Sequence, residues 1–298
     1  MSVFLSRLII FCSIFLIVIY TFLKYVDDGL KKERLGWIKN KDISYDVLIL
    51  GSSRAYRHFD SNYLKDKLNL NVYNLGFDAA SLETQLLLLN YYLKFKSDPK
   101  YIVWEINYNF FETNSDIFSY QELIPIMEDC DISRFLMSNN LVNCFKCKFI
   151  EYLRHKELLK RGMVNYFGNN VNLDSKIINS NWPIELERKS VFDNYNLLAG
   201  LDTSNVVLFN KQLEEIKKKN ITVIFVIPPI YLSSDYLNKI PQMDSLKYYL
   251  NEDSYVVFDY SRFYISYNDG NFGDNVHLNK IGVGLFLNEF ISDFSEIL

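Results

Sequence analysis

Five short apolar runs constrain the fold of this chain more than any other feature. They are rich in Val, Ile and Tyr, show no alternation with polar side chains, and end at turn-forming residues. The runs cover residues 46–50, 71–75, 101–106, 221–227 and 255–258. Strands that are buried on both faces have this pattern, and such strands are typical of parallel sheets. The sequence therefore predicts a parallel sheet of five strands.

Helix-length segments follow most of these runs. Ser81 is suited to cap a helix that ends near Phe95, and residues 205–219 show a helical apolar period that finishes in lysines. Residues 280–294 form another helical stretch near the C-terminus. Strands and helices that alternate at this length imply right-handed crossovers and helices on both faces of the sheet. We therefore expect a doubly wound α/β fold.

One connection is too long for a simple crossover. Residues 112–201, about ninety in all, contain several helical stretches and no clear buried strand. A plain loop of this length is uncommon inside a compact domain. We expect a mainly helical insertion between the third and fourth strands, placed over the carboxyl edge of the sheet. The α/β domain that carries this insertion is predicted to span residues 45–298.

The N-terminus has the composition of a membrane anchor. The run from Leu8 to Leu23 carries no charge, and with residues 3–7 it reaches about twenty residues, enough to cross a bilayer. Because no small-residue cleavage site follows it, we expect a retained single-pass anchor over residues 1–25 and a charged stalk over residues 26–44. Six basic residues between Lys24 and Lys41 follow the span, which by itself favours a cytoplasmic domain.

Composition limits the classes of partner. The net charge of -4 includes no basic excess, so a general electrostatic affinity for nucleic acid is not expected. The sequence has neither a metal-ligand cluster nor a phosphate-binding glycine loop, and we expect no metal or nucleotide cofactor. Cys130, Cys144 and Cys147 allow two interpretations. Two of them form a disulfide if the domain lies outside the cytoplasm, or all three are buried free thiols.

Small and polar residues follow the first strand, where a parallel sheet gathers its ligands. Gly51, Ser52 and Ser53 form a tight turn before a helical stretch. A hydroxyl at this place lies beside backbone N–H groups and the positive end of a helix, which together can stabilise an oxyanion. A serine that only caps the helix would satisfy the same local pattern.

A nucleophilic serine needs a base, and the base needs a group that orients it. The chain has three histidines, His58, His155 and His277. His58 is expected to be exposed or structural, and His155 lies on a basic segment that reads as a solvated helix face. His277 follows Asp274 by three residues on a short loop before the last helix. We therefore predict that Ser53, His277 and Asp274 form a catalytic triad.

These elements resemble the SGNH (GDSL-like) hydrolase superfamily at four blocks in the correct order. Gly51-Ser52-Ser53 stands in place of the G-D-S block, with Ser52 at the position of the family's Asp, and Asp274 and His277 match the D-x-x-H block in full. The resemblance implies a flavodoxin-like order of strands and a serine-dependent esterase or acyltransferase.

The two remaining blocks of the resemblance concern the oxyanion hole. Gly76 falls at the position of the family glycine, and Asn107 is the residue that this chain keeps from the G-x-N-D block, with Asn109 as a substitute. The resemblance implies that the N–H groups of Ser53 and Gly76 and the amide of Asn107 hold the oxyanion.

An apolar span followed by a G-S-S-R block, with Arg54 as its last residue, resembles one branch of that superfamily. The branch contains the extracytoplasmic proteins of teichoic-acid D-alanylation and of alginate and peptidoglycan O-acetylation. The resemblance implies an outward-facing domain, an acylated cell-envelope polysaccharide as substrate, and a membrane-bound O-acyltransferase as partner. Long domains can translocate regardless of flanking charge, so we expect the outward orientation at the cell membrane.

Two alternatives to acyl transfer stay open. The first is a carbohydrate esterase, in which water rather than a sugar hydroxyl accepts the acyl group. The second is a noncatalytic scaffold with the same fold that partners a membrane-bound acyltransferase, which the incomplete third block would favour.

Overall fold

The computed structural model describes residues 2–39, 43–107, 110–111, 120–142, 148–168, 203–232, 240–252 and 255–298. The chain divides into two compact units. The N-terminal unit combines Met1–Asn40 with Ser119–Leu173, and the sheet unit combines Lys41–Phe118 with Asp174–Leu298. The predicted boundaries of anchor, stalk and domain at residues 25 and 44 stay predictions.

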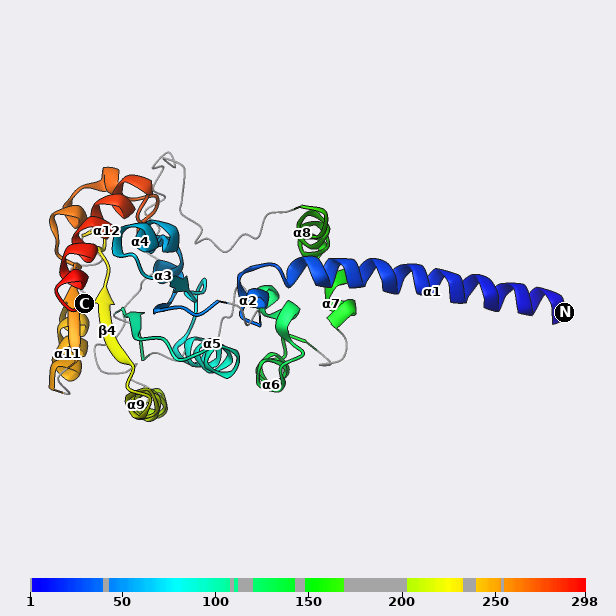
Figure 1. The fold of residues 1–298 in the computed structure, drawn as a ribbon, viewed down its shortest axis with the longest axis horizontal. Helices are drawn as coiled ribbons and strands as arrows, with labels where there is room; N and C mark the ends of the chain where they lie inside the picture. Colours follow the sequence, from blue (N-terminus) through cyan, green and yellow to red (C-terminus); the bar gives the residue numbers. More distant parts are fainter. Residues whose placement is uncertain are drawn as a thin grey trace. The chain divides into compact units, whose positions relative to one another are not determined.

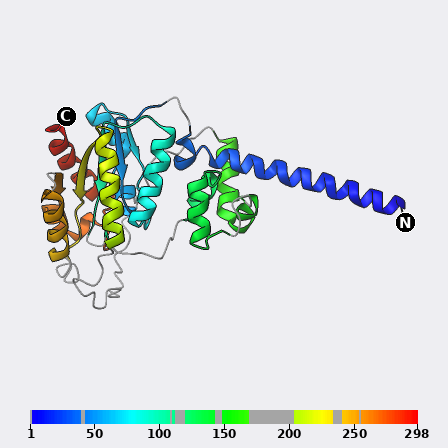
Figure 2. The ribbon, with the colours of Figure 1, turned by 90° about the horizontal axis from the view of Figure 1, so that it is seen from below.

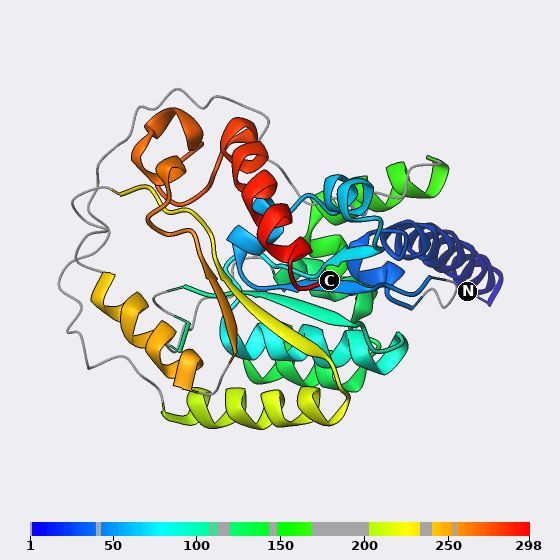
Figure 3. The same cartoon turned by 60° about the vertical axis from the view of Figure 1, so that its left-hand side comes forward.

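The sheet unit contains the predicted five-stranded parallel sheet (Figure 3). Its strands are β1 (Val47–Leu50), β2 (Val72–Asn74), β3 (Tyr101–Glu105), β4 (Thr222–Ile227) and β5 (Val256–Asp259). They are arranged in the order β2-β1-β3-β4-β5, and every neighbouring pair is parallel. This is the flavodoxin-like order, in which ligands bind where the winding direction changes, between β1 and β3. The α/β class and the parallel sheet are therefore confirmed.

Helices cover both faces of the sheet (Figure 1). One face carries α3 (Ser53–His58), α4 (Ser61–Leu68) and α12 (Lys280–Ser295). The other carries α5 (Leu82–Phe95) and α9 (Thr203–Lys218), which lie side by side in Figure 2. The unit also contains α11 (Ile240–Glu252) and the short 3-10 helices η2 (Tyr264–Tyr267) and η3 (Asp269–Asn271). The three helices that the sequence predicts are present, and Ser81 caps α5 by accepting a hydrogen bond from the N–H of Thr84.

Aromatic side chains fill the core on each face of the sheet. On one face Phe59 packs edge-on against Phe286 and Phe290 of α12. On the other, Trp104 of β3 is fully buried, packs against Phe209 of α9, and donates its indole N–H to a glutamine side chain. Each fully buried side chain of this size contributes roughly 1.5–3 kcal/mol. The strand ends that carry polar residues are thus held by a well-packed core.

The N-terminal unit is helical throughout its described elements. It contains α1 (Ser2–Leu30), α2 (Arg34–Trp37), η1 (Tyr120–Ile126), α6 (Cys130–Ser138), α7 (Lys148–Arg154) and α8 (Lys156–Phe167). By length and composition α1 can cross a membrane, and most of its large apolar side chains between Val3 and Phe22 are exposed.

The predicted insertion, residues 112–201, falls partly in this unit. Its described segments, 120–142 and 148–168, are mainly helical, while residues 112–119, 143–147 and 169–201 lie outside the described residues. Cys130 is exposed, and Cys144 and Cys147 lie outside the described residues, so the state of these thiols stays open. The placement of the insertion over the carboxyl edge of the sheet stays a prediction.

Candidate active site

The turn after β1 places Ser53 at the first residue of α3. Gly51 has a φ of 146°, which side chains other than glycine rarely adopt, and a Cβ there would lie 2.6 Å from the Cβ of Glu105. Ser52 caps α3 by accepting a hydrogen bond from the N–H of Arg54. The capping role that the sequence left open therefore belongs to Ser52, and the side chain of Ser53 is available for another partner.

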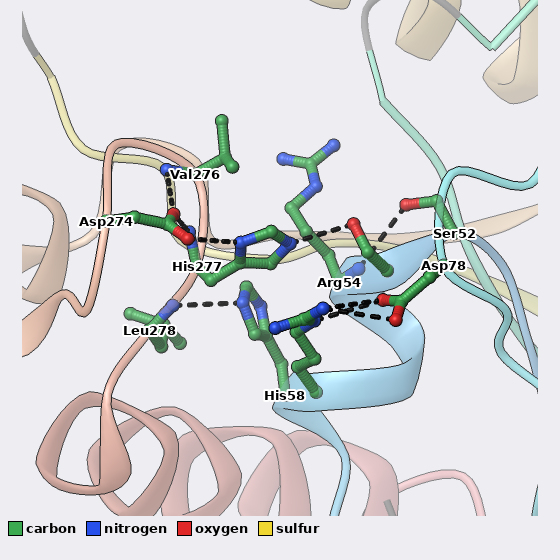
Figure 4. A network of polar contacts seen from close by, with 10 residues as sticks. Ser52, Arg54, His58, Asp78, Asp274, Val276, His277 and Leu278 are labelled. Atoms are coloured by element: carbon green, nitrogen blue, oxygen red, sulfur yellow. Dashed lines mark hydrogen bonds and ion pairs between the residues drawn. The ribbon is translucent and has the colours of Figure 1, made fainter. Parts of the chain in front are cut away.

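Ser53 meets the predicted histidine and aspartate in one hydrogen-bonded series (Figure 4). The Oγ of Ser53 lies 2.8 Å from Nε2 of His277, and Nδ1 of His277 lies 2.8 Å from Oδ2 of Asp274. If Nδ1–H donates to the carboxylate, Nε2 is left to accept from the serine hydroxyl. A general base that activates a serine has this tautomer. Two segments more than two hundred residues apart in sequence thus meet, as the sequence predicted.

The carboxylate of Asp274 also organises its own loop. Its Oδ1 accepts hydrogen bonds from the N–H of Val276 at 2.8 Å and of His277 at 2.7 Å. Burial acts to raise the pKa of Asp274, but the hydrogen bond and charge of His277, with these two N–H groups, lower the pKa below its usual value. Asp274 is therefore ionised at neutral pH and can stabilise a positively charged imidazole.

The loop that carries His277 is braced at both ends. The N–H of Gly273 donates to the carbonyl of His277 at 2.8 Å. Asn279 caps α12 and donates from its side chain to the carbonyl of Gly270 at 2.7 Å. These bonds limit the positions that the imidazole can occupy, which favours a preformed hydrogen bond to Ser53.

A second histidine, His58, lies at the site. From the sequence it was expected to be exposed or structural. It is fully buried, and its Nε2 accepts a hydrogen bond from the N–H of Leu278 at 3.0 Å (Figure 4). Its ring centroid lies 6.0 Å from that of His277. Ser53 and His58 both lie on α3. This helix therefore contacts the side chain of His277 through Ser53 and the N–H of Leu278 through His58. Of the two alternatives, the structural one is correct.

Burial is the main cause of a strongly lowered pKa at His58. Electrostatic interaction with His277, when its ring is protonated, and with Arg54 and Arg57 lowers this pKa further. His58 is thus neutral at physiological pH, and a neutral ring has the lone pair that the N–H of Leu278 requires.

Glu105, the last residue of β3, is a buried carboxylate that sequence reasoning missed. It is fully buried, and its Oε2 accepts hydrogen bonds from the N–H and the hydroxyl of Ser52, each at 2.8 Å. Its Oε1 lies 3.1 Å from the guanidinium of Arg54, which is also buried. Arg54 therefore does not make a surface ion pair, because its pair with Glu105 lies inside the protein, next to the serine turn. The signal in the sequence was an acidic residue inside the apolar run of residues 101–106.

The three groups predicted for the oxyanion hole follow β1, β2 and β3. The N–H of Gly76 donates to Oδ1 of Asn74 at 2.8 Å, and the amide of Asn74 donates to two carbonyls of the α3 region. Asn107 is half-buried after β3, and Asn109 lies outside the described residues. The role of Ser53, Gly76 and Asn107 in binding an oxyanion stays a prediction, and Gly76 would have to share or release its bond to Asn74.

Among the described residues, no group of three or more His, Cys, Asp or Glu side chains is placed to hold a metal ion. His155 lies in the N-terminal unit, where its Nε2 contacts the hydroxyl of Tyr120 at 3.3 Å.

Fold and side chains together define a parallel α/β protein with a Ser-His-Asp arrangement at the carboxyl ends of its strands. No family model matches the sequence, and no curated protein matches it. Among solved structures, the chain is similar to a proposed acylhydrolase from Bacteroides fragilis, with a TM-score of 0.43 and 13% sequence identity over 86% of this chain and 93% of the other. A likeness this distant assigns neither a family nor an activity to the chain.

Proposed function

We propose that this protein is a serine esterase or O-acyltransferase of the SGNH type, with Ser53 as nucleophile. One observation carries the proposal: Ser53 Oγ lies 2.8 Å from Nε2 of His277, whose other nitrogen lies 2.8 Å from Asp274. A hydroxyl, an imidazole and a carboxylate in this series are the parts of an acyl-transfer site, whatever the fold that carries them.

In the proposed reaction, Nε2 of His277 takes the proton of Ser53 as the serine oxygen attacks an ester carbonyl. The carboxylate of Asp274 stabilises the imidazolium, and the N–H groups of Ser53 and Gly76 with the amide of Asn107 hold the oxyanion. Collapse expels the alcohol, which receives the proton from His277. The acyl-serine then passes its acyl group to water or to a sugar hydroxyl, again with His277 as base.

We further propose that α1 anchors the protein in the cell membrane, with the sheet unit on the extracytoplasmic side. The length and exposed apolar surface of α1 support the anchor. The resemblance to the cell-envelope acylation branch supports an acylated polysaccharide as substrate and a membrane-bound O-acyltransferase as partner.

The test is turnover of an activated acetyl ester by the purified full-length protein in detergent. Ser53→Ala should lower kcat by about a thousandfold or more, since the nucleophile of a triad cannot be replaced by its partners. Ser295→Ala, an exposed serine on α12, is the matched control and should retain the wild-type rate. Equal background hydrolysis in wild type and Ser53→Ala would contradict the proposal.

One observation favours the noncatalytic scaffold as a second candidate. The N–H of Gly76 is hydrogen-bonded to Asn74 rather than directed at an empty oxyanion site. A scaffold predicts no turnover of any ester and unchanged binding of its partner in Ser53→Ala. If turnover is found, the mass of the product formed with a glycan acceptor separates a transferase from an esterase.

A further inference from the structure

We propose that α7 and α8 form an interfacial platform that lies on anionic lipid headgroups beside α1. The proposal rests on α1 crossing a membrane, which is part of the proposed function, and it adds a second, peripheral contact with the same bilayer.

Helix α8 crosses α1 in close contact, and Figure 1 shows it nearly end-on while α1 runs lengthwise. A Cβ on Gly29 of α1 would lie 1.8 Å from the carbonyl oxygen of Gly162 of α8, so only glycines allow the two backbones to approach this closely. A helix that crosses a membrane span at a large angle lies along the bilayer surface. Gly29 lies six residues beyond Leu23, the end of the uncharged run, which corresponds to about 9 Å of helix.

The contacts of α8 define which of its sides faces the apolar half of α1. The ring of Tyr166 packs against Tyr25, with centroids 4.7 Å apart. Arg161 and Asn165 instead bind the carboxylate of Glu33, farther from the apolar run. The side of α8 that carries Tyr166 is therefore the side toward the bilayer, and the side that carries Arg161 faces away from it.

The side toward the bilayer has the composition of an interfacial helix. Leu159 and Met163 share a face with Tyr166, at positions i, i+4 and i+7. The same side is flanked by exposed residues, namely Lys156, Lys160 and Phe167. Apolar and aromatic side chains bordered by lysines are typical of helices that lie in the headgroup region.

Helix α7 adds apolar residues beside the uncharged run of α1. The ring of Phe149 packs edge-on against Tyr20 of α1, with centroids 5.7 Å apart, and Tyr20 lies within the uncharged run. Ile150 and Leu153 of α7 are 52% and 55% exposed. Exposure of this kind is unfavourable in water, and it becomes favourable when the side chains enter the acyl boundary of a bilayer.

A buried polar network fixes α7 to α1. Asp27 of α1 accepts a hydrogen bond from the hydroxyl of Tyr152 at 2.5 Å and pairs with Lys148 at 2.5 Å and with Lys31 at 2.7 Å. Since Asp27, Lys148 and Tyr152 are buried in the N-terminal unit, α7 cannot move along α1 without breaking their contacts. Its depth relative to the span is thus set by the fold.

The charge of the platform suits anionic lipids. Of the five basic residues of α7 and α8, Lys148, Arg154 and Arg161 pair with Asp27, Glu151 and Glu33. Lys156 and Lys160 are exposed beside the apolar side of α8. A basic residue close to an anionic bilayer is attracted by the negative surface potential of the headgroups. We therefore identify the ligand of this surface as a bilayer with anionic headgroups.

The experiment measures the depth of nitroxide labels on the full-length protein in vesicles of phosphatidylcholine with phosphatidylglycerol. Native Cys12 reports on the span, and the other three cysteines are replaced by serine. For the other two labels, all four native cysteines are replaced by serine. Phe167→Cys in this background reports on the side of α8 toward the bilayer, and Glu157→Cys is the matched control on another side of the same helix. Collision with oxygen, which concentrates in lipid, is compared with collision with a water-soluble nickel chelate.

The label at position 167 should be reached by oxygen and protected from nickel, and the label at 157 should show the reverse. Adding Lys156→Glu and Lys160→Glu should reduce the protection at 167 several-fold, as should vesicles without the anionic lipid. A label at 167 that nickel reaches freely, while the label at Cys12 is protected, overturns the platform and leaves the anchor intact. If nickel reaches the label at Cys12, both the platform and the anchor are overturned. Protection at 167 that requires an added protein, or that is the same with and without the anionic lipid, also contradicts the proposal.

Discussion

Replacing His58 is the perturbation whose effect on the site can be worked out most fully. His58→Phe keeps a buried ring but removes the acceptor for the N–H of Leu278, which lies next to His277 in the chain. A buried N–H without a partner costs about 1–3 kcal/mol. We expect the free energy of unfolding to fall by about that amount.

The same change should also affect catalysis. If the loop relaxes to satisfy the N–H of Leu278, His277 moves away from Ser53, and each 1.4 kcal/mol lost from the transition state lowers kcat about tenfold. His58→Gln is the matched variant, because its amide oxygen can accept the same hydrogen bond, and we expect it to recover much of both losses. The assays are thermal or denaturant unfolding and ester turnover on the same preparations.

The pH dependence gives a separate signature. In the folded protein the pKa of His58 lies well below its usual value because the ring is buried and faces the charges of Arg54 and Arg57 on α3 and of His277 on its loop, while α12 contributes Phe286. The unfolded chain therefore binds a proton near pH 6.5 that the folded protein does not bind. The contribution of His58 to stability is complete above about pH 6.5 and is lost as the pH falls toward the folded pKa. His58→Gln should flatten this acid-side loss.

Wild-type stability and turnover in His58→Phe would refute the proposed role. So would a His58→Gln variant that is no better than His58→Phe, because the acceptor would then be irrelevant.

Two further predictions concern buried or ionised carboxylates of the site. Asp274→Asn should lower kcat by about a hundred- to ten-thousandfold with little change in KM, because the amide cannot fix the tautomer of His277 or stabilise its cation. Steady-state kinetics measure this effect, and an equal rise in KM at constant kcat would contradict it. Glu105→Gln should destabilise the fold by about 3–5 kcal/mol, because it leaves the charge of Arg54 buried without its carboxylate. Glu215→Gln, which removes the charge from an exposed pair with Lys218, should leave the unfolding curve unchanged. Similar unfolding curves for the two variants would refute the buried-pair argument.

The sequence predicted the sheet and the place of Ser53 for one physical reason, and His277 and Asp274 for another. Strands buried on both faces must be continuously apolar, so the runs before Gly51 and Asn107 are visible without a structure. All strands of a parallel sheet point the same way, so a serine that follows such a strand lies at the carboxyl edge of the sheet. His277 was identified because few bases exist in the chain and Asp274 stands at a useful spacing.

The supporting residues could not be predicted in the same way. Glu105 lies one residue before the end of an apolar run, and a charge at that place usually marks the exposed end of a strand rather than a buried partner for the serine turn. The burial of His58 depends on α12 and on the loop around Leu278, which come from the other end of the chain. Likewise, no local pattern predicts that α8 packs against α1, because that contact depends on two glycines far apart in sequence.

The central claim is that Ser53 is a nucleophile activated by His277, and reaction with a serine-directed fluorophosphonate tests it most directly. Intact mass and peptide mapping should find one adduct per chain, located on Ser53, and absent from both Ser53→Ala and His277→Gln. An adduct on another serine, no adduct at all, or labelling of Ser53 at the wild-type rate in His277→Gln would contradict the account.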